Sequence, residues 1–308
     1  MIINQFKTLS LPPNKDLEGK VSIVTGGSEG IGLGTAILLA KLKSRVIIAS
    51  RSAQKCEKAV IEIKQKTGNN NVEYITLDLS SFASVRNFVR QVKENTDKVD
   101  VVINNAGCVY HTYETTGDGI EKNLQINHLA PLLLTLLLVP IIPKSASSRI
   151  IFVSSNLHLS GKIIIPDTLN LAKDKFNRAQ RYNDTKLMNV LTVKELSKKL
   201  SQTAIIVAAA DPGFTKSNLG AANNSDDFWG KLEVFLIGIF SSLLARNEEQ
   251  GAMTSVYTAI ADDISKGGYY DACAPAKYHP IADDEQFCDE FYKQSLELIG
   301  FDDKEIFQ

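Results

Sequence analysis

The sequence predicts a single α/β domain built on a doubly wound parallel sheet of about seven strands, with helices on both faces. Two observations lead to this fold class. Short β-branched runs alternate with longer segments of helical periodicity, and the runs are largely apolar, as strands covered on both faces should be. The predicted strands are Val21–Thr25, Arg45–Ser50, Val72–Leu77, Val99–Ile103, Arg149–Ser154 and Ala204–Ala209, with a short one near Gly268–Asp271.

The spacing of apolar residues predicts helices between and after these strands. The segment after Ser80 and Ser81, two candidate N-caps, has apolar residues at i, i+3, i+4 and i+7, namely Val85, Phe88, Val89 and Val92. The apolar run Leu129–Ile142 is shorter than the roughly 18 to 20 residues of a membrane span, so we expect a buried helix. Residues 288–299 keep helical spacing and predict a final amphipathic helix.

Composition limits the classes of function. The 308 residues include 34 Lys+Arg and 35 Asp+Glu, a net charge of −1 that gives no electrostatic footprint for nucleic acid. The four cysteines form no C-x-x-C pair, which indicates a reducing compartment and predicts no metal site. Residues 1–18 form a predicted N-terminal arm without signal-peptide features, and residues 19–308 form the domain. We therefore expect a cytoplasmic protein with a small-molecule partner.

The first predicted strand runs directly into a glycine-rich turn, Gly26-Gly27-Ser28-Glu29-Gly30-Ile31-Gly32, and a predicted helix follows at Leu33–Leu42. Glycines let the backbone approach a pyrophosphate closely, and a helix N-terminus offers free N–H groups and a positive dipole end. The spacing G-x-x-x-G-x-G differs from the commonest dinucleotide fingerprint. Taken alone, the pattern is equally compatible with a simple structural turn.

The end of the second predicted strand bears on which dinucleotide the turn would bind. An acidic residue there would hold the ribose 2′-OH of NAD, but the chain has Ala49-Ser50-Arg51-Ser52. A guanidinium pairs bidentately with phosphate oxygens, so Arg51 favours NADP(H) over NAD(H). Two objections stay open: Arg51 could be a solvated residue at a helix start, and Glu29 could repel the phosphate.

Further motifs follow in order on the predicted elements: Asn105-Ala106-Gly107 after the fourth strand, Asn127 within a helix, Ser155 after the fifth strand, and Tyr182-x-x-x-Lys186 opening a helix. Together they resemble the short-chain dehydrogenase/reductase family, over residues 19 to about 213. The resemblance implies a Rossmann-type sheet and hydride transfer between a nicotinamide and a carbonyl or alcohol.

Carried over residue by residue, the family pattern assigns two sets of residues. The catalytic set is Asn127, Ser155, Tyr182 and Lys186. The cofactor-binding set is Gly26, Ser28, Gly30, Ile31, Gly32, Arg51, Asp78, Leu79, Asn105, Ala106, Gly107, Tyr182, Lys186, Pro212, Gly213, Thr215 and Ser217. The resemblance places Asp78 on the adenine side, and Thr215 or Ser217 at the nicotinamide carboxamide.

The spacing of Tyr182 and Lys186 also has a physical meaning of its own. Residues at i and i+4 share one helix face, so both side chains can line one cleft. An ammonium and a nicotinamide cation would lower the pKa of a phenol from about 10, which suits Tyr182 to proton transfer. Ser155 can orient the carbonyl oxygen; the resemblance implies that Lys186 also holds the nicotinamide ribose and that Asn127 supports a proton relay. If Tyr182, Lys186 or Asn127 occurred without the other motifs, we would interpret it as a structural or surface residue.

Other features resemble the retinol dehydrogenase-like and WW-domain-oxidoreductase-like branch of the family. They are the long interval between Ser155 and Tyr182, the Ala49-Ser50-Arg51 strand end, and the later segments Gln250-Gly251-Ala252 and Gly267–Tyr270. His158 lies within the long interval, and we interpret it as a structural residue rather than a site residue.

Residues 217–247 are expected to form the substrate lid, because the family builds its lid after the sixth strand. This apolar segment favours a lipophilic aldehyde or ketone. The alternatives are membrane contact through residues 231–244, a homodimer contact, or a helix packed on the core. Two other functions stay open: an NADP(H)-binding sensor or scaffold with little turnover, and a reductase of activated C=C bonds. A sensor could lose Tyr182 or Lys186, so their presence favours a carbonyl reductase.

Overall fold

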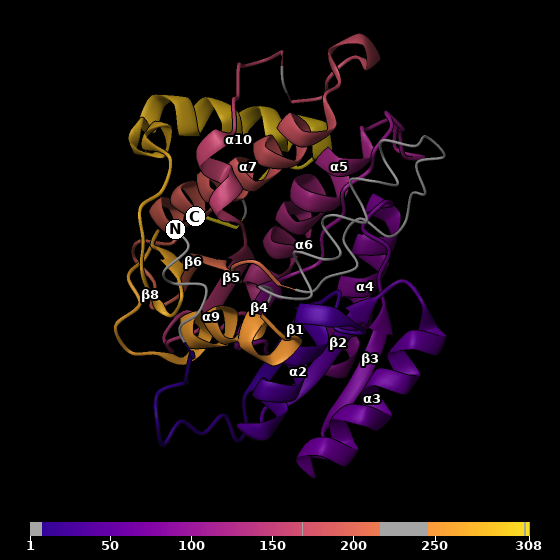
Figure 1. Ribbon diagram of the computed structural model, residues 1–308, viewed down its shortest axis with the longest axis vertical. Coiled ribbons are helices and arrows are strands. Elements are labelled where there is room, and N and C mark those ends of the chain that lie inside the picture. The colour runs from indigo at the N-terminus through magenta and orange to yellow at the C-terminus, as the bar shows by residue number, and fades with distance from the viewer. Residues whose placement is uncertain (1–7, 168, 216–245, 305, 308) are drawn as a thin grey trace.

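One eight-stranded sheet organises the chain (Figure 1). The computed structural model describes residues 8–167, 169–215, 246–304 and 306–307. The strand order is β3-β2-β1-β4-β5-β6-β7-β8, and every neighbouring pair is parallel except β7 with β8. The strands are β1 (Val21–Thr25), β2 (Arg45–Ser50), β3 (Val72–Thr76), β4 (Val101–Asn104), β5 (Arg149–Val153), β6 (Ile206–Asp211), β7 (Tyr269–Asp271) and β8 (Ala274–Pro275).

The predicted fold class is confirmed, with small differences in the strands. β1 and β2 begin and end as predicted, whereas β6 runs to Asp211 because it pairs with β7 as far as Asp271. The eighth strand was not predicted. It is only two residues long and exposed, and the turn before it places Ala272 and Cys273 at φ of 50° and 58° without the Gly or Asn that usually marks such a hairpin.

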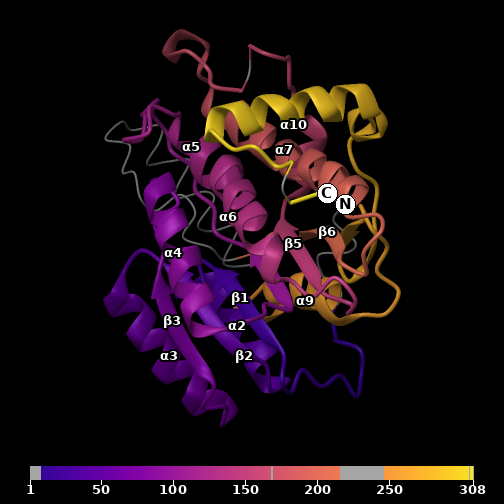
Figure 2. The ribbon, with the colours of Figure 1, turned by 180° about the vertical axis from the view of Figure 1, so that it is seen from behind.

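Helices cover both faces of the sheet (Figures 1 and 2). On one face, α2 (Gly30–Lys41), α3 (Ala53–Thr67) and α9 (Glu248–Ile260) pack on one apolar core. On the other face, α4 (Phe82–Asn95), α6 (Ala130–Leu138), α7 (Arg178–Lys199) and α10 (Glu285–Ile299) share a second core. Two cores on two sides of one sheet are the expected result of strands that are apolar on both faces.

The helices predicted from periodicity are present. The four apolar residues of α4 that the spacing singled out are all buried, and the Ser81 hydroxyl caps the helix by accepting from the backbone N–H of Ser84. The Asp284 carboxylate caps α10 by accepting from the N–H of Phe287 at 3.0 Å. In both helices the buried face lies toward the core, as the apolar spacing indicated.

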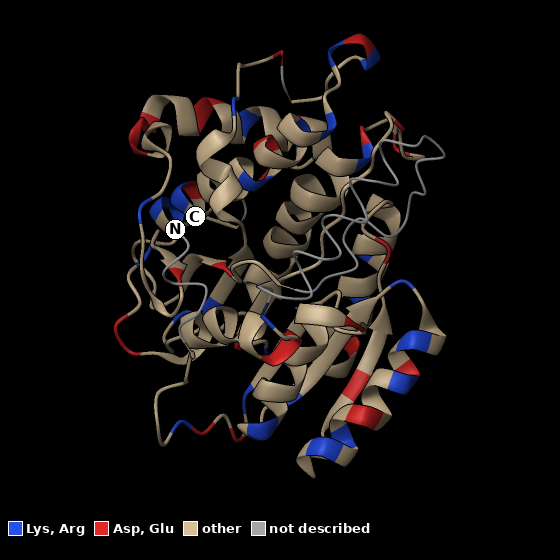
Figure 3. Ribbon diagram, in the orientation of Figure 1, with Lys and Arg blue, Asp and Glu red and all other residues tan. Residues whose placement is uncertain are grey.

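The apolar run near the middle of the chain is a buried helix, as predicted, but it is not uniform. A π-helical turn, η1 (Gln125–Leu129), leads into α6, and a 3₁₀ turn, η2 (Val139–Ile141), ends it. The helical stretch Lys122–Ile141 is long and apolar enough to cross a membrane, yet 78% of its apolar window is buried inside the fold. Figure 3 shows α6 free of charged residues, whereas the outer helix α3 carries many. Burial on this scale is typical of a core helix.

Residues 8–18 lie along one edge of the domain, between α9 and the end of α2, before the first strand (Figure 1). Leu9 is buried and its backbone N–H donates to Gln250 Oε1 of α9 at 2.8 Å. Further along, the N–H of Leu17 donates to the carbonyl of Leu42 at 2.7 Å. The described part of the arm is therefore tied to the domain near both of its ends.

Close packing of α2 against α9 depends on glycine. A Cβ built at Gly34 would lie 2.6 Å from the carbonyl oxygen of Glu248 and 3.3 Å from Ala252 Cβ. A backbone oxygen cannot move away as a flexible side chain can. Any larger residue at this position must push the two helices apart.

We predict that Gly34→Val lowers the free energy of unfolding by about 1–3 kcal/mol, the usual cost of overpacking. Gly117→Val is the control, because a Cβ at exposed Gly117 would meet no described atom within 4 Å. Urea denaturation of both variants measures the difference. Equal stability of the two would show that α2 and α9 have room to separate without cost.

Candidate active site

The glycine turn after β1 packs closely on the segment after β4. Gly26 has φ of +67°, and a Cβ on it would lie 3.1 Å from Ala106 Cα. A Cβ on Gly32 would overlap the carbonyl oxygen of Gly26. Both positions therefore require glycine, for conformation in one case and for space in the other.

Hydrogen bonds lock the same two segments together. The Thr25 hydroxyl accepts from the backbone N–H groups of Asn105 and Ala106, at 3.0 Å each. The Asn105 side-chain amide donates to the carbonyl of Thr25 at 2.9 Å. The predicted glycine and Asn-Ala-Gly motifs thus form one rigid unit at the carboxyl ends of β1 and β4, where ligands bind in open α/β sheets.

The start of α2 fits a dinucleotide diphosphate. Glu29 occupies the N-cap position but makes no capping hydrogen bond with its side chain, and the first turn carries no acidic residue. A Cβ on Gly30, whose φ is +58°, would meet no described atom within 4 Å. The helix therefore presents uncapped N–H groups and its positive dipole end to an open space, a suitable environment for an anion.

Arg51 stands exposed just after β2, next to the glycine turn. The Ser28 hydroxyl donates to Ser50 Oγ at 2.9 Å, which joins the turn to the end of β2. Glu29 does not stand alone here, because its carboxylate forms an ion pair of 2.9 Å with Lys55 Nζ. The negative charge that could have repelled a phosphate is thus balanced by a neighbouring cation.

The predicted adenine-side residues lie beyond β3. Asp78 is half-buried, and its Oδ1 accepts from the backbone N–H and hydroxyl of Ser80 at 2.9 and 2.7 Å. Leu79 is buried in the core. The carboxylate of Asp78 is therefore held in a fixed orientation, while Leu79 anchors the loop.

Two hydrogen bonds tie α7 to the end of β5. The Lys186 ammonium donates to the carbonyl of Val153 at 3.0 Å, and the Ser154 hydroxyl donates to the carbonyl of Lys186 at 2.8 Å. Lys186 is buried, and its Nζ lies 5.5 Å from the centroid of the Tyr182 ring. The i, i+4 pair therefore shares one side of α7, beside the carboxyl edge of the sheet.

Burial dominates the ionisation of this pair. It lowers the pKa of Lys186 to about 8, although the charges of Cys108 and Asp211 oppose this shift. Burial also raises the pKa of Tyr182 above its usual value, and Asp211 and Cys108 raise it further. The shift for the phenol is opposite to the one expected from a neighbouring ammonium and a nicotinamide cation, because desolvation is the largest effect in the protein itself.

Ser155 lies two residues after the end of β5 and is the N-cap of the 3₁₀ turn η3 (Asn156–Ser160). Its hydroxyl is half-buried, accepts from the N–H of Leu157 at 3.3 Å and donates to Asn156 Oδ1 at 3.4 Å. His158 is fully buried, and its Nδ1 lies 2.6 Å from the carbonyl oxygen of Ser155. The imidazole thus supports the Ser155 backbone, in keeping with our structural interpretation of it.

Asn127 lies in the π-helical turn η1, a feature often found at functional sites. Its Oδ1 accepts from the N–H of Cys108 at 2.8 Å, and its Nδ2 donates to the Cys108 carbonyl at 2.9 Å. The same Nδ2 donates to the Thr185 hydroxyl at 3.2 Å, which in turn donates to the carbonyl of Tyr182 at 2.8 Å. Asn127 thereby connects the loop after β4 to α7.

The segment after β6 closes the site as far as Thr215. Gly213 has φ of +72°, and its N–H donates to Asp211 Oδ1 at 2.8 Å. A Cβ on Gly251 of α9 would meet both Thr215 and Ile31, so these two predicted residues lie together. Ser217 and almost all of the predicted lid, including residues 231–244, lie outside the described residues.

Comparison with known proteins gives the family. The short chain dehydrogenase family model matches residues 20–227. The chain belongs to the short-chain dehydrogenase family. Human retinol dehydrogenase 13 is 36% identical over 98% of this chain and 91% of its own, and human retinol dehydrogenase 12 is 35% identical over 93% and 88%. A crystal structure of an uncharacterised protein from Mycobacterium paratuberculosis superposes with a TM-score of 0.76 at 26% identity, covering 96% of this chain and 99% of the other.

Sequence reasoning missed one buried ion pair in this short-chain dehydrogenase. Arg181 Nε donates to Glu121 Oε2 at 2.7 Å, and both side chains are fully buried. The Glu121 carboxylate also accepts from the backbone N–H groups of Asn123 and Leu124, at the start of the helix that leads to Asn127. The pair therefore joins the residue before Tyr182 to the Asn127 helix. Sixty positions separate the partners, and no local sequence pattern marks them.

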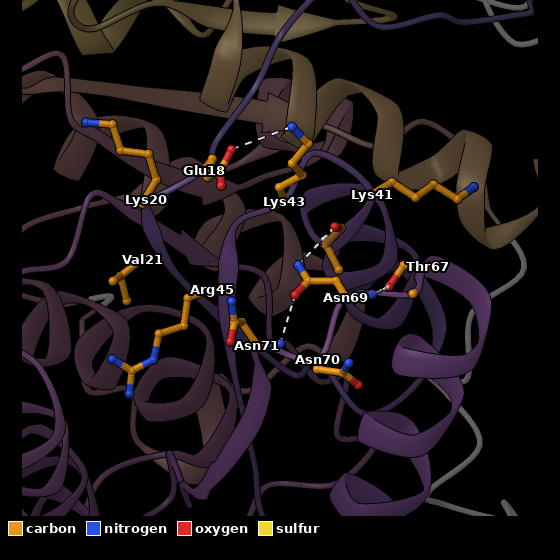
Figure 4. Close-up of a pocket in the computed structure, with 13 residues that line it drawn as sticks. Glu18, Lys20, Val21, Lys41, Lys43, Arg45, Thr67, Asn69, Asn70 and Asn71 are labelled. Atoms are coloured by element: carbon orange, nitrogen blue, oxygen red, sulfur yellow. Dashed lines mark hydrogen bonds and ion pairs between the residues drawn. The ribbon is translucent and has the colours of Figure 1, made fainter.

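A pocket lies at the opposite, amino-terminal edge of the sheet (Figure 4). It is lined by cations that each have an acidic partner: Lys20 with Asp100, Lys41 with Glu249, Lys43 with Asp16 and Glu18, and Arg45 with Glu73. Its cationic groups are therefore already neutralised. None of the predicted site residues lines this pocket.

We predict that Arg181→Met lowers the free energy of unfolding by about 3–5 kcal/mol, because it leaves the Glu121 carboxylate buried without its cation. Arg90→Met is the matched control, since it breaks only exposed contacts, the Arg90–Glu94 ion pair and a hydrogen bond to Asn87, and should cost less than about 1 kcal/mol. Urea denaturation measures both changes. A loss for Arg181→Met as small as that of the control would contradict the anchoring role.

Proposed function

We propose that the protein is an NADP(H)-dependent oxidoreductase of the carbonyl reductase and alcohol dehydrogenase type, and that it reduces a lipophilic aldehyde or ketone. The observation that carries this proposal is the pair of half-buried Tyr182 and buried Lys186 on α7, which lies beside the end of β5 and on the same sheet edge as the uncapped start of α2. A proton donor and a diphosphate cradle at one sheet edge are what hydride transfer from a nicotinamide requires. The family relationship supports the same class of reaction.

The chain's own residues would manage the carbonyl oxygen and its proton. Bound NADP(H) supplies or accepts the hydride. Tyr182 donates its hydroxyl proton to the carbonyl oxygen in reduction and accepts a proton from the alcohol in oxidation. The Ser155 hydroxyl orients that oxygen, and Lys186 stabilises the phenolate that forms. Asn127 holds the loop after β4 against α7 and would support the route by which Tyr182 is reprotonated.

The cofactor proposal depends on Arg51. This exposed cation follows β2 where an NAD-binding chain would carry an acid, and Lys55 balances the nearby Glu29. A guanidinium there can bind the 2′-phosphate of NADP(H) through two parallel hydrogen bonds. Gly26, Gly30 and Gly32 would accommodate the diphosphate, and Thr215 would lie near the carboxamide.

The substrate proposal depends on exposed apolar side chains that follow the site strands. Leu157 and Leu159 follow Ser155 and are 45% and 42% exposed, and Phe214 follows the Pro-Gly turn and is 41% exposed. Apolar groups in these places favour a lipophilic substrate. Relatives that are named retinol dehydrogenase support the same direction, because retinol is a lipophilic alcohol. We also propose that the protein is cytoplasmic. Residues 231–244 would contact either a membrane surface or a second copy of the chain.

We predict that Tyr182→Phe reduces turnover of aldehydes with NADPH at least about 100-fold while NADPH affinity is preserved, because only the transferable proton is removed. Tyr74→Phe, which alters an exposed phenol bonded to Glu57, is the control and should keep full activity. Steady-state absorbance at 340 nm and a fluorescence titration measure the two quantities. Tight NADPH binding without turnover of any carbonyl by the unmodified protein would favour a sensor, and consumption of an enone with its carbonyl intact would favour a C=C reductase.

We predict that Arg51→Asp weakens NADPH binding by about 10- to 100-fold, the value of a charge-assisted phosphate contact, and changes NADH binding far less. Arg86→Asp, an equal charge change on the exposed side of α4, controls for general electrostatics. The dissociation constants of NADPH and NADH, measured for each variant, give the ratio that defines the cofactor preference. An unchanged preference would place the 2′-phosphate elsewhere.

A further inference from the structure

The backbone carbonyl of Ser155 is held more firmly than its hydroxyl. The hydroxyl accepts from the N–H of Leu157 at 3.3 Å and donates to Asn156 Oδ1 at 3.4 Å, both longer than the usual range for such bonds. The carbonyl oxygen instead accepts from two donors of His158, the backbone N–H at 3.0 Å and the ring Nδ1 at 2.6 Å. His158 therefore fixes the backbone from which the Ser155 hydroxyl projects.

The His158 ring packs against Tyr269 of β7. Because a carbonyl oxygen only accepts, Nδ1 carries the ring proton, and burial lowers the pKa of His158, so the ring stays neutral. The other ring nitrogen, Nε2, is buried and has no hydrogen-bond partner in the described part of the chain. The ring lies on the Tyr269 ring, with centroids 4.5 Å apart and planes at 43°. The imidazole thus depends on Tyr269 for its orientation.

The hydroxyl end of Tyr269 is bonded to the turn after β6. It donates to Asp211 Oδ2 at 2.9 Å, and Asp211 Oδ1 accepts from the N–H of Gly213 at 2.8 Å. Burial raises the pKa of Asp211, but these contacts do not require the ionised form. A protonated carboxyl still accepts from Gly213 through one oxygen and exchanges a hydrogen bond with the phenol through the other. The connection from Tyr269 to Gly213 therefore holds whether or not Asp211 is protonated.

Strand pairing places Tyr269 between two parts of the candidate site. Tyr269 pairs with Ala209 of β6, and both side chains belong to the core that α7 covers. Ser155 and the Pro212–Gly213 turn follow β5 and β6, which are neighbouring parallel strands, so both lie at the carboxyl edge of the sheet. One buried phenol is thus connected to the serine segment through a ring contact and to the turn through a carboxyl group.

We propose that Tyr269 is a positioning residue of the hydride-transfer site, which holds Ser155 in register with the Pro212–Gly213 turn through His158 and Asp211. The proposal rests on the proposed function, in which Ser155 orients the carbonyl oxygen and the turn lies beside the nicotinamide. Hydride transfer requires the carbonyl carbon and the nicotinamide to meet within a narrow range of distance and angle. A serine that moves relative to the turn aligns the carbonyl less often, without weakening the binding of cofactor or substrate.

Tyr269→Phe tests this role, because it keeps the ring that packs on His158 and removes only the hydroxyl bound to Asp211. We expect the single-turnover rate of NADPH oxidation by an aldehyde to fall about 10-fold, while the dissociation constants of NADPH and aldehyde change less than about twofold. The single-turnover rate is measured because product release can limit kcat. An unchanged rate in folded Tyr269→Phe would overturn the proposal.

Tyr292→Phe is the matched control. The hydroxyl of Tyr292 on α10 also donates to a buried carboxylate, Asp303 Oδ2, at 2.8 Å, and neither residue belongs to the predicted site. Both variants should lose similar stability, as thermal unfolding measures, but Tyr292→Phe should keep the single-turnover rate of the unmodified protein. An equal fall of the rate in both variants would show a general loss of rigidity and would overturn the positioning role.

His158→Phe is the second variant, because it keeps a ring against Tyr269 but loses the Nδ1 donor to Ser155. It should reduce the same rate by a similar factor. Adding Tyr269→Phe to it should reduce the rate little further, because both changes act through the Ser155 backbone. Reductions that multiply would place the effect of Tyr269 outside this path and contradict the proposal. Full activity of Tyr182→Phe would instead overturn the proposed function beneath it.

Discussion

The candidate site depends on one interaction, the hydrogen bond from the buried Lys186 ammonium to the carbonyl of Val153 at the end of β5. Removing an ammonium from water is costly, and a single carbonyl repays only part of that cost, so the pKa of Lys186 falls to about 8. The return bond from Ser154 to the Lys186 carbonyl fixes α7 in register with the strand. The strand therefore determines both where the ammonium lies and how easily it loses its proton.

The cofactor side is built on a second constraint, the close approach of the turn after β1 to the loop after β4. Thr25 and Asn105 exchange side-chain and backbone hydrogen bonds, and glycine at positions 26 and 32 allows the contact. Asn127 connects the same loop to α7 through its hydrogen bonds to Cys108 and Thr185. The diphosphate cradle and the Tyr182 helix are thus connected by hydrogen-bonded steps, so a cofactor placed by one would be placed relative to the other.

Much of this could be predicted from the sequence, because its signals are local. The apolar alternation gave the order of strands and helices, and the i, i+4 spacing put Tyr182 and Lys186 on one helix face. The features that the sequence did not predict have no local sequence signal. Arg181 and Glu121 meet only through tertiary packing, and β8 follows a turn without glycine. The raised pKa of Tyr182 depends on burial and on Asp211, which lies on another element. Electrostatic effects between residues far apart in the sequence are therefore visible only in the folded structure.

The titration of Lys186 itself is the most direct test, followed by ¹³C NMR of the lysine side-chain Cε signals, with the Lys186 signal assigned from its loss in Lys186→Arg. We predict that this signal titrates near pH 8, because the ammonium is buried beside Tyr182 and bound to the Val153 carbonyl. A midpoint at the ordinary lysine value of about 10.5 would show a solvated ammonium outside the site and would contradict the central claim.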